Sequence, residues 1–417
     1  MKYLFIHQNY PGQFKHLAPA IAAIPGNQVV AIVDDKNKRA ASIQKNVTLY
    51  SYPAPQGSSK ETHWYLRNYE GAIRRGQQVV RLLMELRDKQ KFIPDVICAH
   101  AGWGEALFLK EVFPDAVVLD YFEFFYLSEG SDVGFDKEFQ TQTIDDFCRI
   151  NIKNSTHLLS LNHCDWGLAP TKWQAGQFPP IYQSKISVIH EGVDTDIVKP
   201  NIYASFKVPQ GPLLTAEDKV ITFVNRNLEP YRGFHVFMRA LPQILIDNPD
   251  AHVVLLGGDE VSYGAMPKEG GTWRHKMMAE VGDGLDMKRV HFVGKIPYDQ
   301  YLNLLQISSA HVYLTYPFVL SWSMMESMAA GCIVIASNTP PVTEVMTDGH
   351  DGLLFDFFDV QGLVDKVGKV LKHPEDYAQI RINARKTIVE QYDLKTVCLP
   401  KQVELLQTLS AKGALQD

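Results

Sequence analysis

The sequence has 417 residues, of which 46% are hydrophobic, and its 41 basic and 47 acidic residues give a formal net charge of -6. Because a single hydrophobic core seldom grows beyond about 250–300 residues, this length predicts two domains. The acidic balance argues against a nucleic-acid partner, since domains that bind nucleic acids are usually basic. The five cysteines are widely spaced, which is typical of reduced thiols in a cytoplasmic protein.

The N-terminal apolar run turns polar at His7, which is too early for a signal peptide. No stretch of about 18 apolar residues follows that could span a membrane. We therefore expect a cytoplasmic protein. A peripheral contact with the inner face of the membrane stays open, because one predicted helix carries four arginines, although a solvated helix face is the more common explanation for them. These arginines are Arg67, Arg74, Arg75 and Arg81.

Short apolar runs alternate with helical patterns through the first half of the chain. The runs that predict strands are 2–7, 29–33, 95–99 and 116–119, and the clearest helical patterns are 14–23 and 61–86. Buried runs that alternate with helices indicate a parallel sheet covered on both faces.

The same alternation starts again after about residue 195. The runs of strand type are 220–224, 253–256, 290–293, 311–314 and 333–336, and helical patterns cover 236–246, 298–307, 324–330 and 397–409. Pro200, Pro209 and Pro212 lie between the two halves and indicate a linker. We predict an N-terminal domain over 1–195, a C-terminal domain over 196–394, and a last helix in 395–417 that packs back on the first domain.

The predicted fold class is therefore α/β, with two Rossmann-like, doubly wound domains that face each other across a cleft. In open α/β sheets, ligands bind outside the carboxyl ends of the strands. The cleft between two such sheets is the expected site, and the residues just after each strand are the candidates.

The segment 316–337 carries the strongest signal. A strand leads into the polar turn Ser321-Trp322-Ser323, and a helix begins there and ends at Gly331. The free backbone N–H groups and the positive dipole end of such a helix suit a diphosphate. Glu326 lies about one turn into the helix, where its carboxylate can accept hydrogen bonds from the hydroxyls of a ribose. A surface glutamate after a capped helix is the alternative.

The segment 224–234 places two arginines after a buried run. Arg226 and Arg232 lie in a loop with Pro230 and Gly233. Guanidinium groups bind phosphate oxygens in bidentate fashion, so this pair suits a pyrophosphate. In the alternative reading, both arginines are solvated or paired with Glu229.

Three further loops follow predicted strands. Gly12 allows a close approach of the backbone at the start of the first helix, although a plain turn explains it too. His100 could bind a sugar hydroxyl or take part in proton transfer, but a lone histidine is more often structural. The loop with Lys295 and Ile296 could present backbone groups to a base.

Other chemistries find no support in the sequence. It has no Walker A loop, no G-x-S-x-G elbow and no histidines at metal-ligand spacing. Asp194-Thr195-Asp196 has the spacing of a metal-binding D-x-D, but we interpret it as a turn. We therefore expect neither a metal nor a cofactor. The aromatic loop 121–126 lines the acceptor side or belongs to the core, and the polar stretch 259–283 is a lid or an insertion.

Taken together, these loops resemble the retaining glycosyltransferases of family 4, which have the GT-B fold. The resemblance covers nearly the whole chain, and it is closest to the bacterial branch that opens with an H-Q-N-[FY]-P-G-Q-F turn, here 7–14. Segment 343–355 resembles the segment that follows the family's glutamate helix, and HEGVD at 190–194 resembles its P-N-G-V-D.

The resemblance implies roles for individual residues. Arg226 and Arg232 would hold the donor diphosphate and stabilise its charge as it leaves. Glu326 matches the second glutamate of the E-x7-E motif and would bind the ribose. His100 would contact the transferred sugar. The remaining matches are Leu320, Ser321, Trp322 and Ser323 in the loop whose backbone contacts sugar and phosphate, and Gly12 and Gln13 near the donor phosphates and the acceptor.

One departure concerns the donor sugar. The first glutamate of E-x7-E should fall at position 318, which is Phe318 here. In the family this glutamate contacts hydroxyls of the donor sugar. Position 321 is Ser where Gly is usual, which limits backbone freedom.

The resemblance implies metal-independent, retaining transfer from a nucleotide-diphosphate sugar, with a UDP-sugar as the expected donor. The acceptor would be a hydroxyl of a glycan, a lipid-linked molecule or a protein in bacterial glycan biosynthesis. A GT-B sugar-nucleotide epimerase is one alternative. A weakly active nucleotide-sugar-binding subunit of a glycan assembly complex is another, which Phe318 favours.

Overall fold

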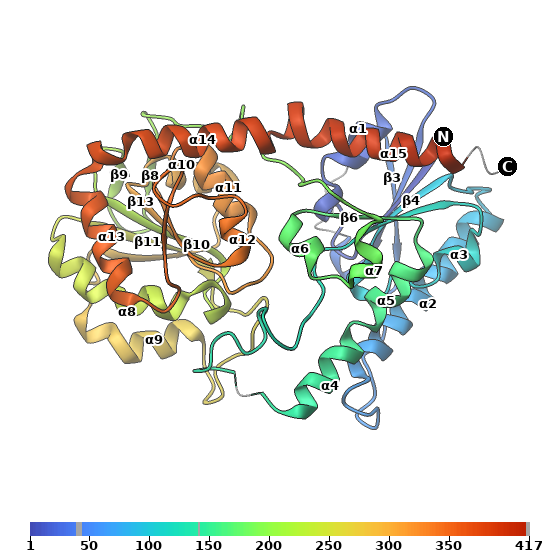
Figure 1. Ribbon diagram of the computed structural model, residues 1–417, viewed down its shortest axis with the longest axis horizontal. Helices are drawn as coiled ribbons and strands as arrows, with labels where there is room; N and C mark the ends of the chain where they lie inside the picture. Colours follow the sequence, from blue (N-terminus) through green and yellow to red (C-terminus); the bar gives the residue numbers. More distant parts are fainter. Residues whose placement is uncertain (39–43, 141, 414–417) are drawn as a thin grey trace. The chain divides into compact units, whose positions relative to one another are not determined.

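The computed structural model describes residues 1–38, 44–140 and 142–413. The chain divides into two compact units (Figure 1). The first unit consists of Met1–Gly192 together with the segment that starts at Leu394, and the second unit is Val193–Asp393. No helix in the described ranges combines the length and the apolar character needed to cross a bilayer.

A parallel sheet of seven strands forms the centre of the first unit. Its order is β3-β2-β1-β4-β5-β6-β7, so the chain winds outward from β1 in one direction and then from β4 in the other. The strands are β1 (Lys2–Ile6), β2 (Gln28–Asp34), β3 (Val47–Tyr52), β4 (Val96–His100), β5 (Val117–Tyr121), β6 (Trp166–Ala169) and β7 (Ile186–Val188).

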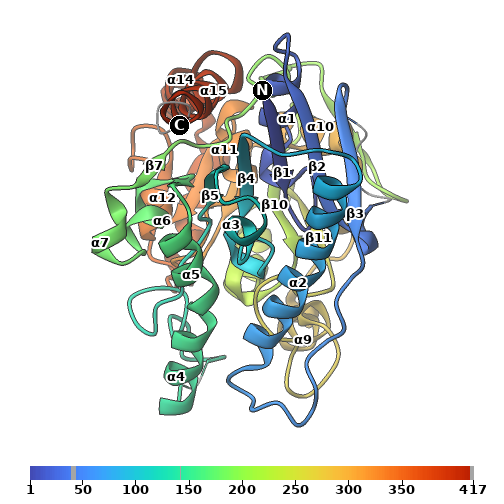
Figure 2. The same ribbon diagram turned by 90° about the vertical axis from the view of Figure 1, so that its right-hand side faces the viewer.

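Helices cover both faces of this sheet because its strands are apolar on both sides. On β1, Leu4 and Ile6 belong to one core cluster, whereas Tyr3 and Phe5 belong to the other. The first cluster is completed by α2 (Arg67–Asp88), α3 (Leu109–Val112), α5 (Ser155–His163) and α6 (Lys172–Gly176). The second is completed by α1 (Leu17–Ala22) and α15 (Leu399–Gly413). Figure 2 shows α2 beside α5; α4 (Ile144–Lys153) precedes α5, and α7 is Pro180–Gln183.

The helix α15 returns to the first sheet from the end of the chain. Leu406 is fully buried in the second cluster. The hydroxyls of Tyr3 and Ser410 lie 3.4 Å apart, and the side chain of Gln402 donates a hydrogen bond to the carbonyl oxygen of His190 at 3.0 Å. The last described helix is thus an integral part of the first unit.

The second unit repeats the same winding in a six-stranded parallel sheet, ordered β12-β11-β10-β13-β14-β15. Its strands are β10 (Val220–Asn227), β11 (His252–Gly258), β12 (Val290–Gly294), β13 (Ala310–Tyr313), β14 (Val334–Ser337) and β15 (Leu353–Phe355). Its helices are α8 (Phe234–Asp247), α9 (Trp273–Val281), α10 (Tyr298–Gln306), α11 (Trp322–Ala329), α12 (Pro340–Thr343), α13 (Val360–Lys372) and α14 (Ala378–Tyr392).

The segment predicted as a linker is partly regular structure. An antiparallel hairpin, β8 (Ser205–Lys207) and β9 (Leu213–Thr215), lies within it. Phe206 and Leu214 of this hairpin are buried in the core of the second unit. Pro209 therefore lies in the hairpin turn and Pro212 directly precedes the second strand, so these two prolines do not belong to a free connection.

The packing of α15 predicts how the stability of the first unit changes when a buried side chain of this helix is shortened. Leu406→Ala should lower its free energy of unfolding by about 2–5 kcal/mol, because the substitution leaves a cavity beside a tightly packed sheet. Gln407→Ala, at the exposed neighbouring position, should change it by less than about 0.5 kcal/mol. Urea unfolding of the full chain, followed by circular dichroism, measures both. Equal stability of the two variants would contradict this packing.

Candidate functional site

Arg226 lies at the carboxyl end of β10, beside the point where the strand order of the second sheet reverses. The pairing of β10 with β11 shifts register between Val224 and Asn227, so the strand is irregular where Arg226 stands. Its side chain is exposed and makes no hydrogen bond or ion pair with the residues that the structure describes. Arg226 is therefore available to an anion.

Arg232 lies in the loop between β10 and α8, and it is buried. Its Nη1 donates hydrogen bonds to the Tyr313 hydroxyl at 3.1 Å and to Thr315 Oγ1 at 2.7 Å. Burial acts to lower the pKa of Arg232, but Tyr313, Tyr263 and Glu229 outweigh it and raise this pKa. Arg232 is thus a permanent cation.

The alternative reading paired the arginines with Glu229, but among the described residues Glu229 forms no ion pair with Arg226 or Arg232. Its carboxylate accepts hydrogen bonds from three successive backbone N–H groups, those of Ser262 (2.8 Å), Tyr263 (3.2 Å) and Gly264 (2.9 Å). The buried Glu229 therefore holds the start of the 259–283 stretch against the arginine loop. The ring of Tyr263 in turn lies 5.1 Å from the Arg232 guanidinium carbon.

The helix α11 begins beside Arg232. Its N-cap is Ser321, whose side chain accepts a hydrogen bond from the Ser323 backbone N–H at 3.3 Å. The backbone N–H of Ser321 donates to the Tyr313 hydroxyl at 2.9 Å. The same phenol oxygen thus accepts from Ser321 and from Arg232, which joins two of the predicted donor-binding residues. The side chain of Trp322 is 43% exposed, whereas that of Leu320 is buried in the core.

Glu326 contacts the helix α10, which directly follows the loop with Lys295 and Ile296. Its two carboxylate oxygens accept hydrogen bonds from the hydroxyls of Tyr298 (2.6 Å) and Tyr301 (2.7 Å), both on α10. Ile296 packs on the core, and Lys295 forms an exposed ion pair with Glu260 at 3.0 Å. Glu326 is therefore held in place by two phenols.

Phe318 lies in an aromatic cluster. Its ring packs edge-on against Tyr231 at 5.6 Å and Tyr263 at 5.0 Å. The position where the resemblance expects a carboxylate is thus occupied by a buried apolar side chain.

In the first unit, Gly12 has a positive φ of 45°, and a Cβ there would lie 2.4 Å from the ring of His7. His7 Nδ1 accepts from the Asn9 backbone N–H at 2.9 Å, so Nε2 carries the proton and donates to Gln13 Oε1 at 2.7 Å. Burial, followed by the charge of His100, lowers the pKa of His7 to about 3, so the ring is neutral at pH 7.

Glu123 joins Gln13 to His100. Gln13 Nε2 donates to Glu123 Oε1 at 3.0 Å, and His100 Nε2 lies 3.4 Å from Glu123 Oε2. This contact is an ion pair only when His100 is protonated, and its geometry falls short of a hydrogen bond. His100 is buried, accepts from the Gly102 N–H through Nδ1 at 3.2 Å, and stacks on Trp103 at 3.8 Å.

A cavity of about 480 Å³ lies in the first unit beside His100. Glu123, Phe124 and Tyr126 of the aromatic loop line it, whereas Tyr121 and Phe122 of the same loop are buried in the two core clusters. The loop therefore belongs in part to the core and in part to the wall of the cavity, and its role on the acceptor side stays a prediction.

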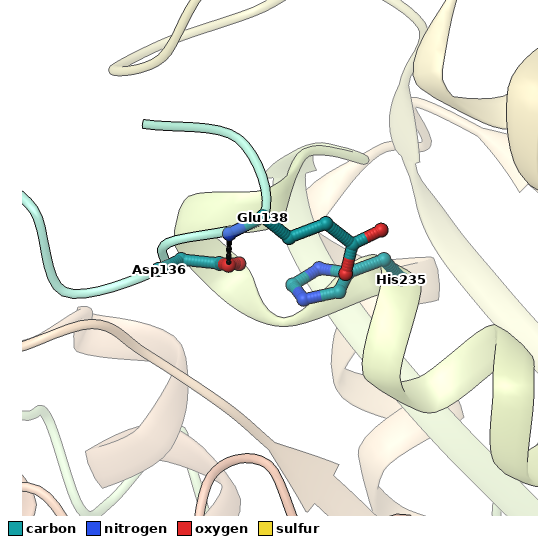
Figure 3. A group of neighbouring side chains, drawn as sticks. All are labelled: Asp136, Glu138 and His235. Carbon is teal, nitrogen blue, oxygen red and sulfur yellow. Dashed lines mark hydrogen bonds between the residues drawn. The ribbon is translucent and has the colours of Figure 1, made fainter. Parts of the chain in front are cut away.

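Two acidic pairs form turns. The Asp194 carboxylate accepts from the Asp196 backbone N–H at 3.2 Å, in agreement with the predicted turn. In the first unit, the Asp136 carboxylate accepts from the Glu138 backbone N–H at 3.0 Å (Figure 3). Each first carboxylate thus binds the backbone two residues further along the chain.

Two residues that connect the candidate site residues to one another were not selected from the sequence. Tyr313 was counted only as part of a buried strand, and its hydroxyl gave no signal. Glu123 is the one carboxylate of the aromatic loop 121–126, and its place just after β5 was the signal that could have identified it. The ligand-binding roles of the selected residues stay predictions.

Family models match both halves of the chain. The model described as glycosyl transferase family 4 group matches residues 25–198, and the one described as glycosyl transferases group 1 matches residues 207–387. A D-inositol 3-phosphate glycosyltransferase of Mycolicibacterium smegmatis is 24% identical over 190 residues, which are 45% of this chain and 40% of the relative. A phosphatidyl-myo-inositol mannosyltransferase of the same organism is 26% identical over 232 residues, 54% of this chain and 55% of the relative. The chain thus spans about half the length of these curated relatives.

Solved structures match the whole chain at low identity. Sucrose-phosphate synthase from Thermosynechococcus elongatus has a TM-score of 0.72 at 16% identity, with 99% of this chain and 100% of that chain covered. Anabaena HepE in complex with UDP-glucose has a TM-score of 0.69 at 16% identity, with 98% and 100% covered. These likenesses show the fold, the two-domain α/β fold known as GT-B. Each of the two family models matches less than half of the chain, but together with the curated relatives they support a GT-B glycosyltransferase of family 4 type.

Proposed function

We propose that this protein transfers a sugar from a nucleoside diphosphate sugar to an acceptor hydroxyl, with retention of the anomeric configuration. The observation that carries the proposal is the convergence of Arg232 and the start of α11 on the hydroxyl of Tyr313. A buried guanidinium and a helix N-terminus together attract a dianionic diphosphate. Both lie beside the strand-order reversal, where open α/β sheets bind their ligands.

Uridine diphosphate is the nucleotide we propose. Anabaena HepE, which shares the fold, is solved with UDP and glucose and with UDP-glucose. Glu326 supports a ribose next to the diphosphate, because its carboxylate already accepts hydrogen bonds from two hydroxyls. The hydroxyls of a ribose can replace that of Tyr298, which is 49% exposed.

The proposed chemistry needs no metal. Arg226 and Arg232 stabilise the charge that grows on the leaving diphosphate, and the first turn of α11 adds its dipole. The leaving phosphate then accepts the proton of the acceptor hydroxyl, which attacks from the same face. His100 and Glu123 in the first unit would orient hydroxyls of the sugars. The acceptor we propose is a glycan, a lipid-linked molecule or a protein in a bacterial cytoplasm, with peripheral contact to the membrane where the acceptor is a lipid.

Arg226 should act mainly in the transition state. Arg226→Ala is expected to lower kcat/KM about 10²–10³-fold, equivalent to about 2.7–4 kcal/mol, as for the loss of one oxyanion donor. The value of kcat/KM is measured from the release of UDP from UDP-glucose in the presence of a panel of acceptors. Arg239→Ala is the matched control, since Arg239 pairs with Glu280 at the surface. Turnover by Arg226→Ala equal to that of the control would count against the proposal.

Glu326 should contribute to nucleotide binding but not to phosphate binding. Glu326→Gln keeps the shape and removes the charge, so we expect the Kd for UDP to rise about tenfold, in the range of a hydrogen bond to a charged group. The Kd for inorganic pyrophosphate should stay unchanged. Isothermal titration calorimetry measures the Kd of the protein and of the variant for both ligands. An equal loss of affinity for UDP and for pyrophosphate would contradict a contact between Glu326 and the ribose.

The alternative functions give different products. An epimerase would convert the sugar of UDP-glucose without an acceptor, which NMR of the donor alone detects. A binding subunit would bind UDP without turnover over the acceptor panel. The aromatic surroundings of Phe318 are the feature that favours the second alternative.

A further inference from the structure

The polar stretch 259–283 begins with a segment that is fixed to the arginine loop. The carboxylate of Glu229 holds the backbone N–H groups of residues 262–264, as described above. The side chain of Asn227, at the end of β10, also donates a hydrogen bond to Ser262 Oγ at 2.9 Å. A buried carboxylate left without partners is strongly destabilising, so these hydrogen bonds are costly to break. The segment is therefore held in place at this point.

A second anchor lies a few residues further along the chain. Trp273, the first residue of α9, is buried and donates through Nε1 to the carbonyl oxygen of Ala265 at 2.8 Å. Between the two anchors, a Cβ on Gly264 would lie 3.3 Å from Glu229 Oε2, so the backbone approaches that carboxylate closely. The backbone that carries Tyr263 is thus fixed from both sides.

The ring of Tyr263 lies beside the buried arginine of the proposed diphosphate site. The guanidinium carbon of Arg232 is 5.1 Å from the centroid of this ring. Burial is the largest cause that raises the pKa of Tyr313, and the neighbouring phenol of Tyr263 adds to it. Tyr263 therefore lies next to the point where Arg232 and the start of α11 converge.

Tyr263 is also the most exposed ring of an aromatic cluster. Its ring centroid lies 5.0 Å from that of Phe318 and 6.2 Å from that of Tyr231, which in turn lies 4.7 Å from Tyr316. Phe318 and Tyr316 are buried and Tyr231 is half-buried, whereas Tyr263 is 37% exposed. A ligand that reaches this cluster from solvent therefore meets Tyr263.

The sugar of a donor would lie close to this ring. In a nucleoside diphosphate sugar, the sugar is bonded directly to the outer phosphate, so it begins next to the anion that Arg232 would hold. A pyranose has C–H groups on its faces, and aromatic rings provide a large apolar surface on which such groups can pack. The carboxylate of Glu229 is directed to the backbone instead, and Phe318 is apolar.

We infer that Tyr263 is a specificity-determining residue, whose ring packs on the C–H face of the donor's pyranose. This inference rests on the proposed function, since it names the residue that recognises the sugar of the same donor. Arg232 and the start of α11 would bind the diphosphate, and the segment that Glu229 holds would position the ring for the sugar. The contact with the sugar is thus separable from the contact with the nucleotide.

Binding of UDP and of UDP-sugars to the full chain tests the inference. Isothermal titration calorimetry gives the Kd for UDP, UDP-glucose, UDP-galactose and UDP-N-acetylglucosamine. Tyr263→Ala should weaken the tightest of the three UDP-sugars about threefold to tenfold, as for the loss of one aromatic contact, and leave the Kd for UDP unchanged. Tyr263→Phe keeps the ring and should retain the affinity for the UDP-sugar.

Tyr203→Ala is the matched control. It removes a tyrosine of the same unit that is 88% exposed, and it should change neither Kd. A ring that only supported the arrangement of Arg232 would affect UDP and UDP-sugar alike, so the difference between the two ligands separates a sugar contact from a structural role.

Four results would overturn the inference. The first is unchanged binding of the UDP-sugar by Tyr263→Ala, and the second is an equal loss for UDP and the UDP-sugar. The third is a loss with Tyr263→Phe as large as with Tyr263→Ala, which would assign the contact to the hydroxyl. The fourth is binding of UDP but of none of the three UDP-sugars. Binding of UDP in each case leaves the proposed nucleotide standing, whereas a folded protein that binds no UDP would contradict that proposal and remove the inference with it.

Discussion

The phenol oxygen of Tyr313 is the point on which the second unit's site depends. It accepts hydrogen bonds from the buried guanidinium of Arg232 and from the N–H that opens α11. A buried donor left without a partner costs about 1–3 kcal/mol, so this oxygen stabilises two elements at once. Burial raises the pKa of Tyr313, and the phenol therefore stays neutral between the two donors.

Each unit places a glycine-containing loop after the first strand of its sheet, and the two sheets have similar topology. In each sheet the strand order reverses beside the first strand, and a glycine with positive φ starts the helical turn or helix that follows that strand. A Cβ on Gly12 would lie 2.4 Å from the ring of His7, and one on Gly233 would lie 2.3 Å from Leu314. Only glycine allows either loop to pack so closely at these angles. The loops that carry Gln13 and Arg232 are thereby held near the strand ends.

Features that are encoded in a local sequence pattern could be predicted from the sequence. The buried apolar runs of β1, β10 and β13 were recognisable, and so were the arginines beyond one of them. The hairpin with Phe206 and Leu214 was read as a linker, because two short strands with prolines beside them become regular only through burial against the rest of their unit. Strands β3, β6 and β15 were missed as well; β3 is only partly buried and lacks a continuous apolar run, and β15 has three residues.

The partners of the site residues were harder to predict than the residues themselves. Glu229 binds N–H groups more than 30 positions further along the chain, and Glu123 bonds to Gln13 across 110 positions. Such contacts follow from topology, which the local pattern specifies only in outline.

Two carboxylates lie near the proposed diphosphate site, and both are already engaged by hydrogen bonds. Glu229 is engaged by three backbone N–H groups, and Glu326 by two tyrosine hydroxyls. At position 318 an aromatic ring replaces the carboxylate that the resemblance expects, and its neighbour Tyr263 belongs to the loop that Glu229 holds. Under the proposed function, Glu229 is structural and Glu326 would face the ribose. Recognition of the donor sugar beside Phe318 would then depend on shape and on apolar contact, which discriminate between sugars less strongly than hydrogen bonds do.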